Sequence, residues 1–312
     1  MNTDPASAWP SLAVDDWTGT RDTLHMWTQI VGKVRMAKAP MLNHWWQVTL
    51  YVTPRGLTTS AVPDGLRNFE MLFDFCDHRL VIAVEGGEQR SVALEPKTVK
   101  QFHAEVMAAL DELGIEAEIW PQPVEVEESI PFTQDETHRS YDPDAAQRFW
   151  RQLVQTERVL TRFRSRYAGK VSPVHFWWGG MDMSVTRFSG RPAPRHPGGA
   201  PNCGDWVMVE GYSHELSSAG FWPGGGGEGH FYAYAYPEPD GFRTHPVLPE
   251  AAFYNEEAGQ YLLGYREVRE SADPDALLLD FLQTTYEAAA DNGEGWDRES
   301  LEYRPVEGAR PG

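Results

Sequence analysis

The chain is poor in cysteine, with Cys76 and Cys203 as the two examples among 312 residues. Neither lies in a C-x-x-C motif or at a zinc-ligand spacing, so the sequence shows no sign of a disulfide framework, and this usage is typical of a reducing compartment. The sequence also lacks an apolar window of about 18 residues and a basic N-terminal segment followed by an apolar run. We therefore expect a cytoplasmic protein that does not enter a membrane.

Positive charge is scarce as well. There are 27 basic and 46 acidic residues, and the net charge is −19. A field of this sign repels phosphate backbones and anionic lipids, so we expect neither nucleic acid nor a membrane as a partner. A small-molecule ligand is the expected partner, and the sequence leaves the oligomeric state unknown.

Familiar catalytic motifs are absent too: no G-x-S-x-G elbow, no Walker A loop and no H-E-x-x-H pair is found. Gly224, Gly226 and Gly229 match G-x-G-x-x-G in form, but they precede a predicted strand instead of a helix, so we assign the match no meaning. The substrate, the reaction, any cofactor and any metal are therefore unknown from motifs.

Hydrophobic periodicity is clear in much of the chain. It predicts helices over 18–37, 96–113 and 142–169 and from 273 onward, the last two beginning with Asp-Pro. Strand-like runs are Trp45–Thr53, Phe69–Phe75, Arg79–Glu85, Ile115–Trp120, Val174–Val185, Trp206–Tyr212, Phe231–Tyr236 and Tyr261–Val268. In Phe231–Tyr236, strict alternation predicts tyrosine on one face and alanine on the other.

The order helix, strands, helix occurs twice along the chain. Asn43-His-Trp-Trp46 follows the first helix and Val174-His-Phe-Trp-Trp178 follows the third. We interpret this as an α+β fold of two topologically similar halves, produced by internal duplication, with a mainly antiparallel sheet and helices packed on one face. The predicted halves are 1–135 and 136–290, the second with a Gly/Pro-rich insertion at 190–229, followed by a polar tail at 291–312.

Three residues are candidates for catalysis: His214, Glu210 and His25. On a strand over Trp206–Tyr212 and beyond, Glu210 and His214 would share a face, which suits general acid–base work or a divalent metal completed by His175 or His230. His25 lies on the polar face of the first helix, beside Gln29. The alternatives are a structural His–Glu pair and a solvated helix face.

The ligand-binding candidates combine aromatic, imidazole and charged groups. They are His44, Trp46, Arg55, His175, Trp177, Asp182, Arg187, Tyr212 and Trp222. Aromatic rings provide flat walls, and the two arginines suit a carboxylate or phosphate. The alternatives are hydrogen-bonded core histidines and arginines paired with local acids.

Several segments carry a resemblance to a known family. Leu24–Gly32, Asn43–Trp46, Arg55–Thr59, Tyr212–Glu215 and Ala219–Pro223 resemble an uncharacterised bacterial family, a domain of unknown function. The resemblance covers roughly Trp9 to Tyr286. It implies one family along the chain and a bacterial source, and it assigns no activity to any residue.

These observations lead to one hypothesis and two alternatives. The hypothesis is a cytoplasmic enzyme that acts on a small polar or anionic organic molecule in an aromatic, His-lined cleft between the halves. The alternatives are a non-catalytic small-molecule binding protein and an oligomeric scaffold in which the tryptophan segments form the interface.

Overall fold

The computed structural model describes residues 8–303, which form an α+β fold. Its α-helices are α2 (Val14–Lys38), α3 (Val99–Glu112), α4 (Pro143–Arg164), α5 (Asp205–Gly211), α6 (Tyr265–Arg269), α7 (Pro274–Asn292) and α8 (Arg298–Leu301), with 3-10 turns η1 (Asn43–Trp45) and η2 (Phe242–Thr244). The strands follow in two groups. The first holds β1 (Tyr51–Thr53), β2 (Gly56–Thr58), β3 (Val62–Asp64), β4 (Arg67–Asp74), β5 (Arg79–Val84) and β6 (Gln89–Ala93). The second holds β7 (His175–Trp177), β8 (Asp182–Pro192), β9 (His214–Trp222), β10 (His230–Tyr236), β11 (Phe253–Asn255) and β12 (Gln260–Gly264).

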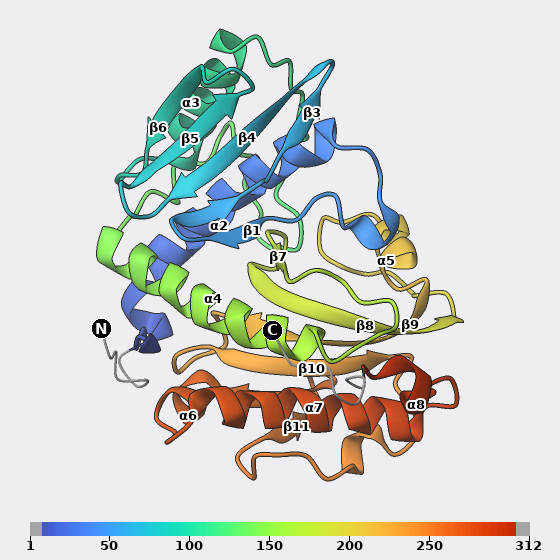
Figure 1. Ribbon diagram of the computed structural model, residues 1–312. Helices are drawn as coiled ribbons and strands as arrows, with labels where there is room; N and C mark the ends of the chain where they lie inside the picture. The colour runs from blue at the N-terminus through green and yellow to red at the C-terminus, as the bar shows by residue number, and fades with distance from the viewer. Residues whose placement is uncertain (1–7, 304–312) are drawn as a thin grey trace.

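Each group of strands makes one six-stranded antiparallel sheet. The first has the order β1-β2-β4-β5-β6, with β3 also paired to β4, and the second has the order β11-β12-β10-β9-β8-β7. Helices α4 and α7 lie side by side on one face of the second sheet (Figure 1). The predicted α+β class and antiparallel pairing are confirmed. The face of the second sheet opposite α4 and α7 lines a cavity.

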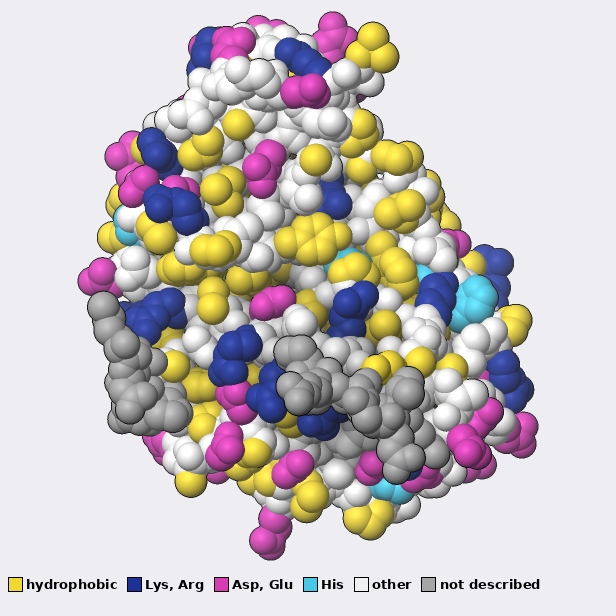
Figure 2. Space-filling view, viewed as in Figure 1, with side chains coloured by type: hydrophobic (Ala, Val, Ile, Leu, Met, Phe, Trp, Pro, Cys, Tyr) yellow, Lys and Arg dark blue, Asp and Glu magenta, His cyan; other side chains and the backbone are white. Residues whose placement is uncertain are grey.

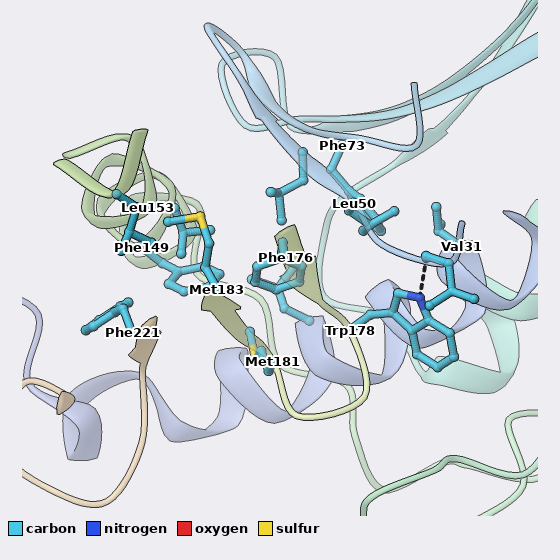
Figure 3. Packing of buried hydrophobic residues seen from close by; sticks show 14 of the residues in the cluster. Val31, Leu50, Phe73, Phe149, Leu153, Phe176, Trp178, Met181, Met183 and Phe221 are labelled. Atoms are coloured by element: carbon cyan, nitrogen blue, oxygen red, sulfur yellow. Dashed lines mark hydrogen bonds between the residues drawn. The ribbon is translucent and has the colours of Figure 1, made fainter. Parts of the chain in front are cut away.

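The two sheets meet edge to edge. Leu50, just before β1, and Phe176 in β7 form an antiparallel bridge in which each N–H donates to the other's carbonyl at 2.9 Å. Both side chains are fully buried, and Phe149 of α4 packs against Phe176 with ring centroids 6.3 Å apart. Figure 3 shows this junction within a core cluster that includes residues of both sheets.

Local sequence explains where the long helices begin. The Asp142 carboxylate accepts hydrogen bonds from the N–H groups of residues 144 and 145 at the start of α4, and the Asp273 carboxylate accepts one from the N–H of residue 276 in α7. Thr98 and Gln101 form a reciprocal capping box on α3. Proline at the first helical position of α4 and α7 has no N–H, so one donor of the first turn needs no partner.

Five predicted strands differ from the structure in detail, and one of them, Tyr261–Val268, is strand β12 only as far as Gly264 and helix α6 from Tyr265 onward. Trp206–Tyr212 is not a strand: most of it belongs to α5, so Glu210 is helical and does not share a strand face with His214. Ile115–Trp120 has no regular structure, because its apolar residues dock on the core while no neighbouring strand pairs with it. Trp45–Thr53 is a strand only at its end, and Val174–Val185 is a hairpin.

The predicted Gly/Pro-rich insertion and polar tail both contain regular structure. Residues 190–229 contain the end of β8, α5 and all of β9. Within the described part of the tail, the Trp296 ring packs on Tyr286, and the carbonyl of Leu301 accepts a 2.7 Å bond from the Ala168 N–H. Residues 304–312 lie outside the described range.

Gly56 in β2 offers a test of sheet packing. A Cβ at this position would lie 1.7 Å from the backbone oxygen of Phe73 in β4, which cannot move without breaking the strand pairing. We expect Gly56→Ala to lower the free energy of unfolding by about 3 kcal/mol or more, measured by denaturant titration. The matched variant Gly211→Ala has no atom within 4 Å of its added Cβ; an equal loss there would contradict the steric explanation.

Candidate functional site

A cavity of about 650 Å³ lies against the free face of the second sheet. Its floor comes from alternate residues of three strands: Asp182, Ser184, Thr186 and Phe188 of β8, Leu216, Ser218 and Trp222 of β9, and His230, Tyr232 and Tyr234 of β10. The intervening residues of β10, Phe231, Ala233 and Ala235, join the core. The predicted separation of tyrosine and alanine is thus confirmed. The volume lies within the usual range for small-molecule sites, about 300–1,000 Å³.

Tryptophan makes much of the cavity wall. The lining includes Trp45, Trp46, Trp120, Trp177, Trp178, Trp206 and Trp222. Helix α5 lies beside the η1 turn, where the Trp45 and Trp206 rings are 5.0 Å apart (Figure 1). Figure 2 shows hydrophobic side chains gathered across the middle of the molecular face seen there, with acidic and basic side chains interspersed around them.

Two carboxyl groups face the same point of the cavity. A Cβ at Gly180 would lie 2.9 Å from Asp182 Oδ1 and 3.5 Å from Glu125 Oε2. Asp182 accepts a short hydrogen bond from the Tyr232 hydroxyl. Among the described residues, no lysine, arginine or histidine forms an ion pair with either carboxyl group.

Both carboxyl groups have raised pKa values. Burial, against the opposing effect of the Tyr232 hydrogen bond, raises the pKa of Asp182 to about 6. Loss of hydration, with a smaller contribution from the Asp182 charge, raises the pKa of Glu125 to about 7. The Glu125 side chain has a large accessible surface, but it lines the cavity, where protein surrounds it. Near neutral pH such a pair can both donate and accept a proton.

Several hydroxyl groups line the same cavity as the carboxyl pair. The Tyr212 and Tyr234 hydroxyls are 2.9 Å apart, as are those of Thr186 and Ser218. Burial raises the pKa of Tyr232 well above its ordinary value, so this phenol stays protonated and remains a hydrogen-bond donor. The floor therefore offers several fixed polar groups in an otherwise aromatic cavity.

The polar face of α2 fixes the segment that carries Glu125. The Gln29 side chain donates to the Val124 carbonyl and accepts from the Val124 N–H, both at 2.9 Å. His25 Nε2 donates to the Gly179 carbonyl at 2.7 Å, and Gly179 packs on the Glu125 carboxyl group. Burial lowers the pKa of His25. His25, predicted to be catalytic, therefore holds the wall around Glu125 and does not line the cavity.

His44 belongs to a second polar group at the cavity edge. Its Nδ1–H donates to the Gly211 carbonyl at 3.1 Å, and its Nε2 accepts from Lys170 Nζ at 2.6 Å, so the ring is neutral. Glu210 accepts the backbone N–H of His44 at 3.0 Å, and the His214 ring lies edge-on to His44 at 5.6 Å. Burial, and then the Lys170 charge, lower the pKa of His44.

Among the residues that the structure describes, Lys33 of α2 is the one lysine or arginine that lines the cavity. The residue is 1 % exposed and its Nζ has no hydrogen-bond partner. The Trp120 ring covers it at 4.9 Å from Nζ. Burial lowers the pKa of Lys33 to about 8, and the nearby Cys203 partly offsets this effect.

The structure brings together half of the predicted site residues. Those that line the cavity are His44, Trp46, Trp177, Asp182, Tyr212 and Trp222. Glu210 and His214 lie behind His44, and His25 lies behind Gly179. Of the four histidines predicted for the site, His44 and His214 are in ring contact.

Three other predicted residues have different environments. Arg55 binds Asp74 and Asp77 at the β4–β5 turn, away from the cavity. Arg187 is buried with its guanidinium 3.5 Å from the Phe163 ring centroid and donates to the Phe163 carbonyl. His175 is fully buried between aromatic rings, and burial lowers its pKa to about 3. The two arginines therefore do not hold an anion in this cavity.

Backbone strain concentrates around the cavity. Seven described residues other than glycine have positive φ, and four of them line the cavity: His44 (58°), Trp45 (62°), Glu125 (58°) and Asn202 (51°). A fifth, Met181 (59°), precedes Asp182. Such conformations persist where surrounding structure enforces them, and they cluster at functional sites.

Sequence reasoning missed Glu125 and Lys33. Glu125 lies in an irregular acidic segment that gives no periodic signal. Lys33 had a signal, since it continues the spacing of four that links His25 to Gln29 on α2. The suggested His–Glu metal centre has no counterpart: in residues 8–303, no group of three or more His, Cys, Asp and Glu is placed to hold a metal.

Comparison with family models places residues 9–303 in a family of unknown function, DUF5996. The chain belongs to DUF5996. This confirms the resemblance predicted from the motifs. Neither the curated proteins nor the solved structures give a significant match. Across residues 8–303, no helix combines the length and apolarity needed to cross a bilayer.

Proposed function

We propose that this DUF5996 member is an enzyme that performs general acid–base chemistry on a small polar organic molecule in the tryptophan-walled cavity. The observation that carries the proposal is the Asp182–Glu125 pair, two carboxyl groups that face one point. Raised pKa values support it, because a group that titrates near the working pH exchanges protons readily. The Tyr232 hydroxyl and the tryptophan walls would orient the substrate.

The cavity also bears on the two alternatives. Trp46, Trp177 and Trp178 line it within one chain, which favours contact with a ligand over the interface of a scaffold. A binding protein without turnover would use the same walls. The difference lies in whether the carboxyl pair acts on the ligand or only contacts it, and turnover measures that difference.

A metabolite experiment tests the proposal. Purified protein is incubated with a small-molecule extract, and mass spectrometry follows which compounds are consumed. We expect the wild type to deplete at least one compound and Glu125→Gln to do so about 100-fold more slowly, because the amide cannot exchange the proton.

Glu127→Gln is the matched control, since Glu127 is exposed two residues away and does not line the cavity. Retention of a compound without its consumption would identify a binding protein. Equal turnover by Glu125→Gln and the wild type would show that Glu125 takes no part in the reaction.

We also propose that the two halves share an origin by internal duplication. Each sheet is antiparallel and lies between helices in the chain, and reciprocal hydrogen bonds join their edges at Leu50 and Phe176. The His-Trp segments differ locally, since His44 is in a 3-10 turn and His175 is in a strand. Superposition of β1–β6 on β7–β12 in chain order is the test, and opposite strand directions relative to the flanking helices would contradict it.

A further inference from the structure

Ionisable groups of both signs line the cavity without a partner of opposite charge among residues 8–303. Lys33 Nζ is buried, has no hydrogen-bond partner and forms no ion pair in the described part of the chain. The Asp182 and Glu125 carboxyl groups also have no cationic partner there. Burying an ionisable group without compensation is unfavourable, so proteins normally pair such groups. A cavity in which groups of both charges lack an ion-pair partner is suited to a ligand that carries both charges.

The two signs occupy different places in the cavity. Asp182 lies on β8, and Glu125 meets it from the segment held by Gln29. Lys33 lies on α2 under Trp120. The Cys203 thiol also lines the cavity, and the charges of Lys33 and Glu125 both act on it. Lys33 forms no ion pair with Asp182 or Glu125, so the cavity has an acidic part and a basic part.

We propose that the cavity binds a zwitterion, a small organic molecule that carries an ammonium and a carboxylate group, such as an amino acid. The ammonium contacts Asp182 and Glu125, and the carboxylate binds Lys33, taking the place of the Trp120 indole. The tryptophan walls contact the ammonium end and the apolar part of the ligand. This inference rests on the proposed function, whose substrate class it names.

This arrangement explains why we do not expect a ligand that carries a single charge. An anion without an ammonium would approach two carboxyl groups, and like charges in an enclosed site repel. A cation without a carboxylate would leave Lys33 unpaired. One molecule with both charges satisfies both parts of the cavity, and each charge-assisted hydrogen bond adds to its affinity.

Binding of matched probes tests the inference without any need for turnover. One set is L-phenylalanine, phenethylamine and 3-phenylpropionate, and the other is 6-aminohexanoate, hexylamine and hexanoate. The members of a set differ only in which charges they carry, and the sets differ in the separation of the charges. Calorimetry and thermal shift near neutral pH give affinities for the full chain.

We expect the zwitterion of at least one set to bind about tenfold or more tightly than both analogues that carry a single charge. In Lys33→Met, the zwitterion should bind no more tightly than the amine. In Asp182→Asn, the zwitterion should bind no more tightly than the acid. Lys100→Met and Glu127→Gln, which alter exposed residues outside the cavity, should keep both advantages.

Two results would overturn the inference. One is that in neither set does the zwitterion bind better than both analogues, which includes the absence of binding by all six compounds. The other is a zwitterion preference that survives Lys33→Met and Asp182→Asn. If either result occurs while the wild type still consumes a metabolite that Glu125→Gln spares, the proposed enzyme function stands and the zwitterion class alone is wrong.

Discussion

Asp182→Asn is expected to reduce turnover by about 100-fold to 10,000-fold and, at pH 8, to raise the free energy of unfolding by about 2 kcal/mol. The first effect follows because asparagine can accept the hydrogen bond from the Tyr232 hydroxyl, as aspartate does, but cannot exchange a proton with the substrate. The second follows because burial disfavours the carboxylate. One substitution should therefore move activity and stability in opposite directions, as is common where a site is built from unfavourable interactions.

The sign of the stability effect depends on pH. The pKa of Asp182 is about 6 in the folded protein, against an ordinary value of 3.8, so the folded state binds this proton more tightly. The free energy of unfolding of the wild type then falls as pH rises from about 4 to about 6. Asparagine does not titrate, so the gain should be present at pH 8 and absent at pH 4. Denaturant unfolding at both values measures it.

Asp64→Asn is the matched control with the opposite sign. Hydrogen bonding to Lys38, and then to Arg67, lowers the pKa of Asp64, so its carboxylate stabilises the folded state above the ordinary pKa. Its replacement should reduce stability at pH 8 and have less effect as the pH falls. A stability gain in both variants at pH 8 would show that burial of Asp182 is not the cause.

Lys33→Met is expected to raise the free energy of unfolding by about 3 kcal/mol at pH 7. Burial lowers the pKa of Lys33 to about 8 from an ordinary 10.5, and each unit corresponds to about 1.4 kcal/mol. Below pH 8 both states carry the proton and the folded protein bears the full penalty of the buried charge. Methionine has a similar shape and no charge.

The advantage of methionine should shrink at high pH. Between pH 8 and 10.5 the folded state loses the Lys33 proton before the unfolded state does, so the wild type gains stability. We expect the difference between variant and wild type to fall by about 2 kcal/mol from pH 7 to pH 10. Lys100→Met, at an exposed ion pair with Glu136, should change stability by less than about 0.5 kcal/mol. A gain for Lys33→Met that is the same at both pH values would rule out the buried charge as its source.

Much of the fold is predictable from periodicity and caps. The stripes of α2 and α3 and the Asp-Pro starts of α4 and α7 define long helices, and alternation in β8 and β10 assigns their faces correctly. Local patterns failed where tertiary contacts decide the structure. Ile115–Trp120 alternates as a strand does, yet it lies on the core without a pairing partner.

The candidate site was partly predictable for the same reason. Asp182 was identified because alternation on a strand defines a face, and Tyr212 and Trp222 because they lie close to His214 in the sequence. Glu125 was not, because it reaches the site through the fixed backbone of an irregular segment, which depends on Gln29. Arg187 was predicted to bind the ligand, but it does not line the cavity. Strand alternation places Thr186 in the cavity and therefore turns Arg187 toward the core.

The reciprocal hydrogen bonds between Leu50 and Phe176 have a mechanical consequence. The η1 turn precedes one edge strand and the Gly179–Gly180 turn follows the other, and residues of both turns line the cavity. The bridge therefore holds together two parts of the cavity wall, one from each sheet. A substitution that breaks the bridge would change the shape of the cavity without touching any residue that lines it.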